Sequence, residues 1–242
     1  MWPFKSVKSL KDSGLFRDFI DVHSHILPGV DDGIPDVESS IKVLALYESL
    51  GVKKVWFTPH IMEDIPNDPE HLKEIFSQLS EKWKGSVEIA LAAEHMLDNM
   101  FVERLETGRV LPIGQDYQHL LVETSYYTPP MGMDSILDNI KSKGYFPILA
   151  HPERYRYMDE DDYRKLKERG VLFQLNFISL VGGFGDTARK KAEWLMSNEM
   201  VDMVGSDVHR LERFLKSMEE SPRKPNILKT LLEIAHNPKI SL

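Results

Sequence analysis

The chain has 242 residues, of which 42% are hydrophobic and 28% charged, a composition that allows a globular protein with a sizeable core. Its net charge of −8 argues against partners such as nucleic acid or an anionic membrane surface. It contains no cysteine, which excludes disulfides, zinc–thiolate sites and a cysteine nucleophile. We read no signal peptide and no apolar run of the roughly 20 residues that a membrane helix needs, and we therefore expect a cytoplasmic protein without membrane insertion.

Seven short apolar runs recur along the chain. Each is rich in β-branched or aromatic residues and is bounded by turn-forming residues, which predicts a buried strand. In order, the runs are residues 19–27, 53–60, 87–95, 119–126, 146–152, 172–180 and 201–209. Amphipathic stretches with apolar residues at three- and four-residue spacing predict helices between them. These stretches are Val37–Leu50, Pro69–Trp83, Met133–Lys143, Asp161–Glu168 and Thr187–Ser197.

The alternation of predicted strands and helices indicates a parallel sheet with right-handed crossovers. Reactive side chains fall at or just beyond the ends of six of the seven predicted strands. Parallel strands that close into a barrel bring their carboxyl ends to one rim, whereas an open sheet gathers only the residues near its switch point. We therefore predict a single-domain α/β fold, a distorted (β/α)7 TIM-like barrel over residues 19–242, preceded by an N-terminal extension at residues 1–18.

The first reactive pair is His23 and His25. Residues two apart in a strand point to the same face, so both imidazoles can reach one metal ion. Taken alone, the pair is explained equally well as two polar residues at a strand end. The loop that follows carries Asp31 and Asp32, which alone would fit an ordinary Asp-Gly turn. Asp21, just before the pair, could orient a ligand imidazole through a hydrogen bond.

The remaining strand ends favour the functional interpretation. They carry His60, Glu94, Glu123, His151, Asp207 and His209. Each could be a hydrogen-bonded strand terminus, but together they would share one rim, and we therefore predict a metal cluster.

The types of ligand in this cluster indicate its chemistry. Imidazoles and carboxylates without thiolates suit Mn, Fe, Zn or Ni, and glutamates that can bridge indicate two or three divalent ions. Such ions would outweigh the ligand carboxylates and attract a phosphate dianion to an otherwise acidic protein. They would also activate water, which predicts a phosphoester hydrolase.

The chain closely resembles the polymerase-and-histidinol-phosphatase (PHP) superfamily at these residues. Within it, the chain resembles the bacterial protein-tyrosine phosphatases of capsule and exopolysaccharide loci. The matching motifs are DVHSHILPGVDDG at 21–33, TPH at 58–60, Glu94, Glu123, HPERY at 151–155 and SDVH at 206–209. They extend over nearly all of the predicted barrel.

The resemblance implies a trinuclear site, with manganese or iron favoured. One ion would be held by His23, His25, Glu94 and Asp207, a second by Glu94, Glu123 and His151, and a third by Asp32, His60 and His209. A metal-bridging hydroxide would attack the phosphorus. The catalytic residues would be Arg154, which binds the phosphoryl oxygens, together with Asp207 and His209.

The resemblance also implies contacts with the substrate. The family often carries a second arginine after the D-x-H motif, where this chain has Phe214. Arg210 and Arg213 lie close by in the sequence, so either is a candidate phosphate ligand. Tyr126 and Tyr127 offer rings that could stack against a phosphotyrosine.

The function implied is that of a metal-dependent protein-tyrosine phosphatase linked to capsule or exopolysaccharide regulation. Its partner would be a phosphotyrosine-containing protein, such as the tail of a bacterial tyrosine kinase. Two alternatives stay open: a small-molecule phosphatase such as a histidinol-phosphate phosphatase, and a catalytically silent docking module. The sequence also leaves open whether the protein is a homo-oligomer.

Overall fold

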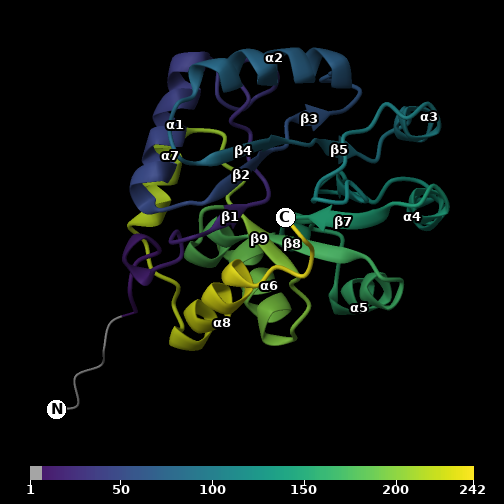
Figure 1. Ribbon diagram of the computed structural model, residues 1–242. Coiled ribbons are helices and arrows are strands. Elements are labelled where there is room, and N and C mark those ends of the chain that lie inside the picture. The colour runs from purple at the N-terminus through teal and green to yellow at the C-terminus, as the bar shows by residue number, and fades with distance from the viewer. Residues whose placement is uncertain (1–6) are drawn as a thin grey trace.

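Strands and helices alternate along most of the chain (Figure 1). The structure is a computed structural model that describes residues 7–242. Its strands are β1 (Ile20–Asp21), β2 (Lys54–Phe57), β3 (His60–Ile61), β4 (Glu88–Leu91), β5 (Glu94–Met96), β6 (His119–Glu123), β7 (Phe146–Ala150), β8 (Leu172–Asn176) and β9 (Met203–Gly205). Its α-helices are α1 (Val37–Leu50), α2 (Pro69–Lys82), α3 (Phe101–Glu106), α4 (Met133–Ser142), α5 (Glu160–Glu168), α6 (Asp186–Ser197), α7 (Leu211–Met218) and α8 (Pro225–His236). Three short 3-10 segments are η1 (Lys11–Ser13), η2 (Pro152–Arg154) and η3 (Phe177–Val181).

The named strands pair in parallel in two sheets. One sheet has the order β1-β2-β4, and the other has the order β3-β5-β6-β7-β8-β9. Only two residues separate β2 from β3, and two separate β4 from β5, so the same chain stretches contribute to both sheets. The predicted parallel α/β fold in a single domain is therefore confirmed.

The two sheet ends also meet beyond β1 and β9. Ser24 and Val208 form an isolated parallel bridge. The backbone N–H of His25 donates to the Val208 carbonyl at 3.1 Å, and that of Asp207 donates to the His23 carbonyl at 2.8 Å. These bonds hold the end of the first predicted strand beside the end of the last one.

The five predicted helices are confirmed as α1, α2, α4, α5 and α6, with ends that differ by one residue at most. Capping explains why the bounds were readable. In α1, the Asp36 side chain accepts a hydrogen bond from the backbone N–H of Ser39 at 2.8 Å, and Gly51 ends the helix at φ 84°. The predicted strand 172–180 is wrong beyond Asn176, because the chain turns there into η3.

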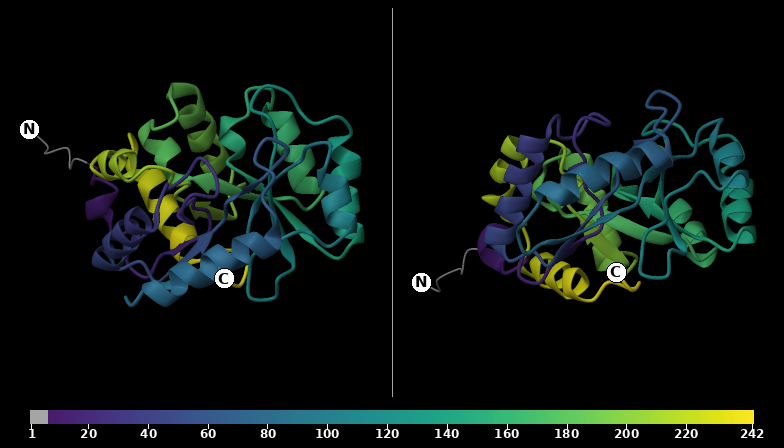
Figure 2. Two further views of the ribbon diagram at one scale, coloured as in Figure 1. Left: turned by 90° about the horizontal axis from the view of Figure 1, so that it is seen from above. Right: turned by 45° about the horizontal axis from the view of Figure 1, so that its top comes forward.

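Helices lie outside the strands in the views of Figures 1 and 2. One face of the strands carries a compact apolar cluster that includes Val22, Trp56, Leu121 and Met203, all at most 2% exposed. Ile240 and Leu242 of the C-terminal segment pack onto it. A larger apolar cluster lies between the strands and the helices. Burial on both faces explains why the strands read as continuous apolar runs.

Part of the predicted N-terminal extension packs against this larger cluster. Leu10, Leu15 and Phe16 are buried, and the Phe16 ring centroid lies 5.9 Å from that of Phe177 and 6.0 Å from that of Phe214. Residues 1–6 of the extension lie outside the described residues. From Leu10 to Phe16, the chain therefore contributes to the core.

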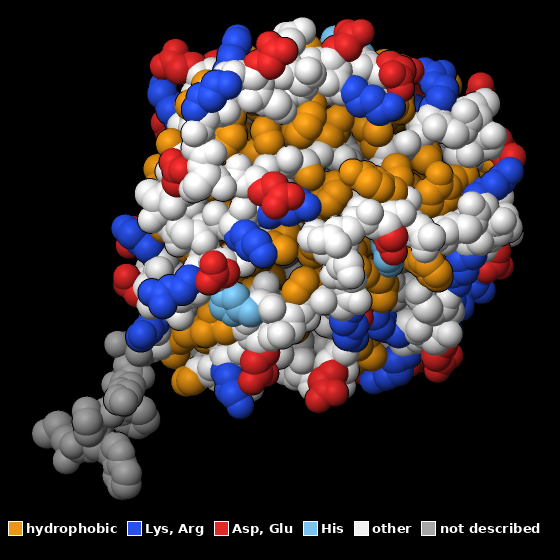
Figure 3. Space-filling model, viewed as in Figure 1, with side chains coloured by type: hydrophobic (Ala, Val, Ile, Leu, Met, Phe, Trp, Pro, Cys, Tyr) orange, Lys and Arg blue, Asp and Glu red, His pale blue; other side chains and the backbone are white. Residues whose placement is uncertain are grey.

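The surface mixes charges of both signs. On the face shown in Figure 3, acidic and basic side chains are interspersed around patches of apolar atoms. Within residues 7–242, no helix combines the length and the apolar character that crossing a bilayer requires.

Candidate metal centre

The structure brings together all nine predicted ligand side chains, although they come from distant parts of the sequence. They are His23, His25, Asp32, His60, Glu94, Glu123, His151, Asp207 and His209. His60 and Glu94 begin the short strands β3 and β5, Glu123 ends β6, and the others except Asp32 follow β1, β7 or β9. Asp32 belongs to the loop after β1. Four groups of three or four of these side chains have ligand atoms within 4.8 Å of one another.

The most buried group surrounds one carboxylate oxygen of Glu94. His23 Nε2 lies 3.2 Å from Glu94 Oε2, and His25 Nε2 lies 3.3 Å from the same atom. Asp207 Oδ1 is 3.5 Å from His23 Nε2 and 3.4 Å from His25 Nε2. Four potential ligand atoms thus converge on one small volume, and the residues His23, His25 and Glu94 are fully buried.

A second group gathers between Glu94 and Glu123. His151 Nε2 lies 2.9 Å from Glu94 Oε1 and 3.9 Å from Glu123 Oε2. His60 Nδ1 lies 3.1 Å from Glu94 Oε2 and 2.9 Å from Glu123 Oε1. Glu94 therefore contacts both groups and is placed to bridge two ions.

The third group is the most open to solvent. Asp32 Oδ1 lies 3.3 Å from His209 Nε2 and 3.5 Å from His60 Nε2, and the Asp32 side chain is 66% exposed. His60 presents one ring nitrogen to this group and the other to Glu94 and Glu123. Which ion His60 holds therefore depends on which metal ions are bound.

Unsatisfied buried atoms indicate that this cluster fits metal ions. Among the described residues, His60 Nδ1, Glu94 Oε2, Glu123 Oε1 and Asp207 Oδ1 are buried and lack a hydrogen-bond partner. Buried polar atoms are normally paired, because an unpaired one costs about 1–3 kcal/mol. All four atoms are hard or intermediate donors that divalent ions accept, so the donor set fits the group that the sequence predicts.

The electrostatics of the cluster tie its imidazoles to its carboxylates. Burial and the neighbouring His60 lower the pKa of His25, but Asp31 and Glu94 outweigh them and raise it to about 9. Burial raises the pKa of Glu94, yet the imidazoles around it hold the pKa well below its usual range. A proton on His25 therefore competes with a metal ion, and binding of metal at His25 must release it.

Two candidate ligands are oriented by residues that the sequence did not suggest. His23 Nδ1 lies 2.7 Å from Gln174 Oε1, an acceptor, so Nδ1–H donates and Nε2 offers its lone pair to the cluster. His25 Nδ1 lies 2.8 Å from Asp31 Oδ2 and is held in the same tautomer. Such partners fix the ring and raise the basicity of the ligand nitrogen.

Gln174 continues into a buried chain of hydrogen bonds. Its Nε2 donates to Asn176 Oδ1 at 3.0 Å, and Asn176 Nδ2 donates to Asp207 Oδ2 at 2.7 Å. The backbone N–H of Asn176 donates to Glu153 Oε1 at 3.1 Å. A signal was present, because Gln174 and Asn176 are two polar residues on the same face of an apolar strand.

The prediction that Asp21 orients a ligand imidazole is wrong. Its Oδ1 accepts from the backbone N–H groups of His23 and Ser206, and its Oδ2 accepts from the Tyr47 hydroxyl at 2.6 Å. Asp21 is fully buried, and it links the ends of β1 and β9 through the backbone.

Arg154 lies at the edge of the cluster. Its Nη1 donates to Asp207 Oδ2 at 2.7 Å. The guanidinium carbon lies 4.4 Å from the Tyr126 ring centroid and 4.2 Å from that of Phe184.

The ligand residues His151 and Asp207 hold left-handed backbone conformations, at φ 34° and φ 52°. Such conformations are retained where the surroundings enforce them, often at functional sites.

A pocket of about 410 Å³ opens above the cluster. It is lined by Asp32, His60, Glu94, Tyr126, His151, Arg154, Ile178, Phe184, Asp207, Val208, His209, Arg210, Arg213 and Phe214. Arg210 Nη1 donates to the carbonyls of Gly33 and His209, and Arg213 donates to the carbonyl of Gly183. Tyr127 lies outside this pocket and is 65% exposed. Most of the predicted substrate-binding residues therefore line the pocket, and Tyr127 lies outside it. Those in the pocket are Tyr126, Arg154, Arg210 and Arg213.

The parallel α/β fold and the buried cluster of imidazoles and carboxylates define the chain as a candidate metalloprotein of the α/β class. The chain belongs to the capsular polysaccharide synthesis CpsB/CapC family, whose model matches residues 19–231.

Curated relatives of the chain include two tyrosine-protein phosphatases. CpsB of Streptococcus pneumoniae is 31% identical over 204 residues, which covers 80% of this chain and 84% of the relative. YwqE of Bacillus subtilis is 29% identical over 198 residues, which covers 80% of this chain and 78% of the relative.

Solved structures also match this chain. One comes from the crystal structures of YwqE from Bacillus subtilis and CpsB from Streptococcus pneumoniae, which are described as metal-dependent tyrosine phosphatases. It has 26% sequence identity and a TM-score of 0.74, and the match covers 91% of this chain and 96% of that chain. A histidinol phosphate phosphatase from Lactococcus lactis, solved with zinc, L-histidinol and phosphate, has a TM-score of 0.54 at 15% identity and covers 91% of this chain and 94% of that one. The second likeness shows a shared fold.

Proposed function

We propose that this protein is a metal-dependent protein-tyrosine phosphatase that acts in capsule or exopolysaccharide regulation. The observation that carries the proposal is the buried cluster of ligand atoms with Arg154 at its edge, beneath a pocket with an aromatic wall. Two relatives from the same family are named tyrosine-protein phosphatases, which supports this substrate class over others.

The proposal includes two or three divalent ions, with manganese or iron favoured among Mn, Fe, Zn and Ni. One ion would be held by His23, His25, Glu94 and Asp207, a second by Glu94, Glu123 and His151, and a third by Asp32, His60 and His209. The four groups of converging ligand atoms share His23, His25, His60 and Glu94, which supports fewer ions than groups, and the absence of thiolates from the ligand set supports these metals. When bound, such ions supply activation of water and neutralisation of phosphoryl charge.

The residues of the chain would hold and orient the phosphate ester. Arg154 is placed to bind phosphoryl oxygens through the guanidinium N–H groups that Asp207 does not occupy. Tyr126 and Phe184 flank this guanidinium and would pack against the phenyl ring of the substrate. His209, half-buried at the mouth of the pocket, would act with Asp207 and Arg154 in catalysis.

We assign the other candidate substrate residues to supporting roles. Arg210 and Arg213 line the pocket, but each donates to backbone carbonyls, so they would add positive charge rather than the main phosphate contact. Tyr127 would contact the polypeptide around the phosphotyrosine, since it faces a neighbouring groove.

For the architecture of the α/β fold, we propose a distorted (β/α)7 barrel. Counting β2 with β3 and β4 with β5 gives seven strand stretches in the described residues, and the Ser24–Val208 bridge joins the first to the last. We propose residues 19–242 as the catalytic domain and residues 1–18 as an N-terminal extension. The match of the family model to residues 19–231 supports this start.

The proposed partner is a phosphotyrosine-containing protein, such as the tail of a bacterial tyrosine kinase, and a homo-oligomer stays open. We propose a cytoplasmic location, which the cysteine-free sequence suits because a reducing compartment does not support disulfides. The capsular polysaccharide synthesis family supports a role in that pathway.

The experiment compares substrates on one metal-loaded preparation. The protein is loaded with manganese, its metals are counted, and kcat/KM is measured on a phosphotyrosine peptide, a matched phosphoserine peptide and histidinol phosphate. We expect a clear preference for the phosphotyrosine peptide. Equal or faster turnover of histidinol phosphate would replace the proposal with the small-molecule alternative. Absence of both bound metal and hydrolysis would favour the docking module.

A further inference from the structure

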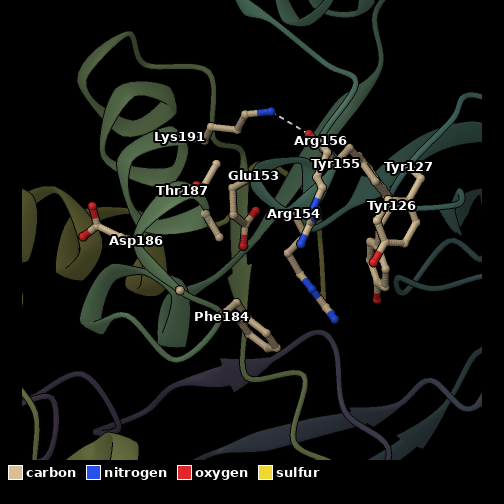
Figure 4. Close-up of a pocket in the computed structure, with 12 residues that line it drawn as sticks. Tyr126, Tyr127, Glu153, Arg154, Tyr155, Arg156, Phe184, Asp186, Thr187 and Lys191 are labelled. Carbon is tan, nitrogen blue, oxygen red and sulfur yellow. Dashed lines mark hydrogen bonds between the residues drawn. The ribbon is translucent and has the colours of Figure 1, made fainter.

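A second hollow adjoins the metal pocket. It has a volume of about 630 Å³, and it shares Tyr126, Arg154 and Phe184 with the pocket above the metal cluster. Its other walls come from the loop after β6, the loop after β7 and the first turn of α6 (Figure 4). We call this hollow the flanking groove. Because the two hollows share these three lining residues, a molecule seated over the metal cluster can extend into the flanking groove.

The shared wall has a defined geometry. The Arg154 guanidinium lies between the rings of Tyr126 and Phe184, at 4.4 Å and 4.2 Å from their centroids. A phosphotyrosine bound by Arg154 would therefore have its backbone at the boundary between the metal pocket and the flanking groove. The residues next to it in the substrate would then lie in the flanking groove.

Two cations of the flanking groove are available to a ligand. Arg156 has no carboxylate within 4.0 Å among residues 7–242, and its guanidinium lies 5.0 Å from the centroid of the Tyr127 ring, which is 65% exposed. Lys191 Nζ donates to the carbonyls of Tyr155 and Met158. An ammonium has three N–H donors, so one remains for a ligand.

The acidic residues of the flanking groove do not cancel this charge at its surface. Glu153 is only 1% exposed, and its Oε1 accepts from Ser179 Oγ and the backbone N–H of Asn176 in the floor. Asp186 points away from the groove (Figure 4) and is paired with Arg189. Asp159 and Asp162 offset part of the charge of Lys191. The positive charge of the groove therefore rests mainly on Arg156, on a protein whose net charge is −8.

We infer that the flanking groove binds the polypeptide next to the phosphotyrosine and selects acidic side chains there, with Arg156 and Lys191 as the residues that determine this specificity. The inference rests on the proposed function, because it extends the same substrate out of the metal pocket. Charge complementarity at an open groove acts on specificity and encounter more than on the chemical step. Its effect should thus fall on KM and weaken as salt is added.

The test uses phosphotyrosine peptides that differ only in their flanks. One set carries aspartate and glutamate on the N-terminal side, another carries them on the C-terminal side, and a matched set carries asparagine and glutamine. We compare the metal-loaded protein with Arg156→Gln and with Lys229→Gln, which removes the same charge from an exposed position on α8. Hydrolysis of p-nitrophenyl phosphate, which has no flank, reports on the metal site alone.

We expect kcat/KM to favour the better acidic peptide over its neutral match by about three- to tenfold at low salt, as a few partly exposed charge contacts allow. Arg156→Gln should remove most of this ratio through KM, whereas Lys229→Gln should keep it and both should hydrolyse p-nitrophenyl phosphate normally. Lys191→Met should also reduce the ratio, with folding checked by thermal unfolding. Equal kcat/KM for acidic and neutral peptides would overturn the inference, as would an unchanged ratio in Arg156→Gln.

A binding measurement separates this inference from the proposed function. Fluorescence anisotropy with the labelled peptides reports on the flanking groove even if no peptide is hydrolysed. If the protein binds acidic peptides preferentially through Arg156 but hydrolyses none of them, the inference about the flanking groove stands and the proposed phosphatase function is rejected. If it hydrolyses the peptides without preferring acidic ones, the phosphatase function stands and the inference about the groove is rejected.

Discussion

Arg154 donates a hydrogen bond from Nη1 to Asp207 Oδ2 at 2.7 Å, although the two residues lie 53 positions apart in the sequence. Asp207 Oδ1 faces His23 and His25 at 3.4–3.5 Å. One carboxylate therefore joins the candidate phosphate-binding arginine to the candidate metal ligands. The Arg154 side chain contacts the candidate ligands through this hydrogen bond, and its backbone N–H also donates to the His151 carbonyl at 2.9 Å.

Arg154→Ala is expected to lower kcat/KM on a phosphotyrosine peptide by about 10²–10³-fold, the usual effect of removing one charged donor from a transition state. Asp207 keeps its bond from Asn176 Nδ2, so the metal content should stay unchanged. Kinetics and elemental analysis on the same sample check both points. If the variant loses metal in proportion to activity, Arg154 is structural.

Glu94→Gln should remove bound metal and with it nearly all turnover. The side chain is fully buried and lies within 3.3 Å of His23, His25, His60 and His151, so its charge serves more imidazoles than any other carboxylate in the cluster. Elemental analysis after gel filtration measures the loss. Glu106→Gln, on the surface, is the matched control, and equal metal in both variants would contradict a ligand role for Glu94.

Metal should stabilise the protein more strongly as the pH rises from about 6.5 to about 9. The pKa of His25 is raised to about 9 in the metal-free protein, so the stability that its proton contributes is present below the ordinary pKa and is lost through this window. Metal competes with that proton and gains what the proton loses. Thermal unfolding with and without manganese under argon gives the difference in melting temperature. His71→Gln, at an exposed histidine, controls for other titrations, and a difference that shrinks with pH would refute the expectation.

Gln174→Met should weaken metal binding by about 10–100-fold, the usual cost of losing a partner that orients a ligand. The amide oxygen fixes His23 with Nδ1–H outward and Nε2 towards the cluster, and methionine cannot accept that bond as well. Metal titration of the chelator-treated protein measures the affinity. Gln174→Glu, which still accepts the bond, should bind metal more tightly than Gln174→Met, and Gln78→Met on the surface of α2 should behave as wild type. No difference between the Gln174 and Gln78 variants would remove the orienting role.

The sequence was informative about elements because their signals are local. The five predicted helices carry apolar stripes, and three of them, α1, α2 and α5, begin after an aspartate whose side chain caps the first turn. Helix α1 also ends at Gly51. Breaks within the predicted strands were harder to recognise in the sequence. The apolar runs 53–60 and 87–95 each read as one strand, but each splits between the two sheets. Which strand a run pairs with depends on partners far away in the chain.

The sequence by itself determined eight of the nine side chains that the fold gathers, because each stands at or near the end of an apolar run. The ninth, Asp32, lies in the loop after β1 and was implied only by the family resemblance. Only the tertiary structure decided how these side chains are supported. Gln174 meets His23 across 151 residues, and no local pattern encodes that distance. The flanking groove is likewise built from two loops and the start of α6, which meet only after folding. Positions along a strand follow from its two-residue period, whereas hydrogen bonds and cavities between distant segments depend on how those segments pack.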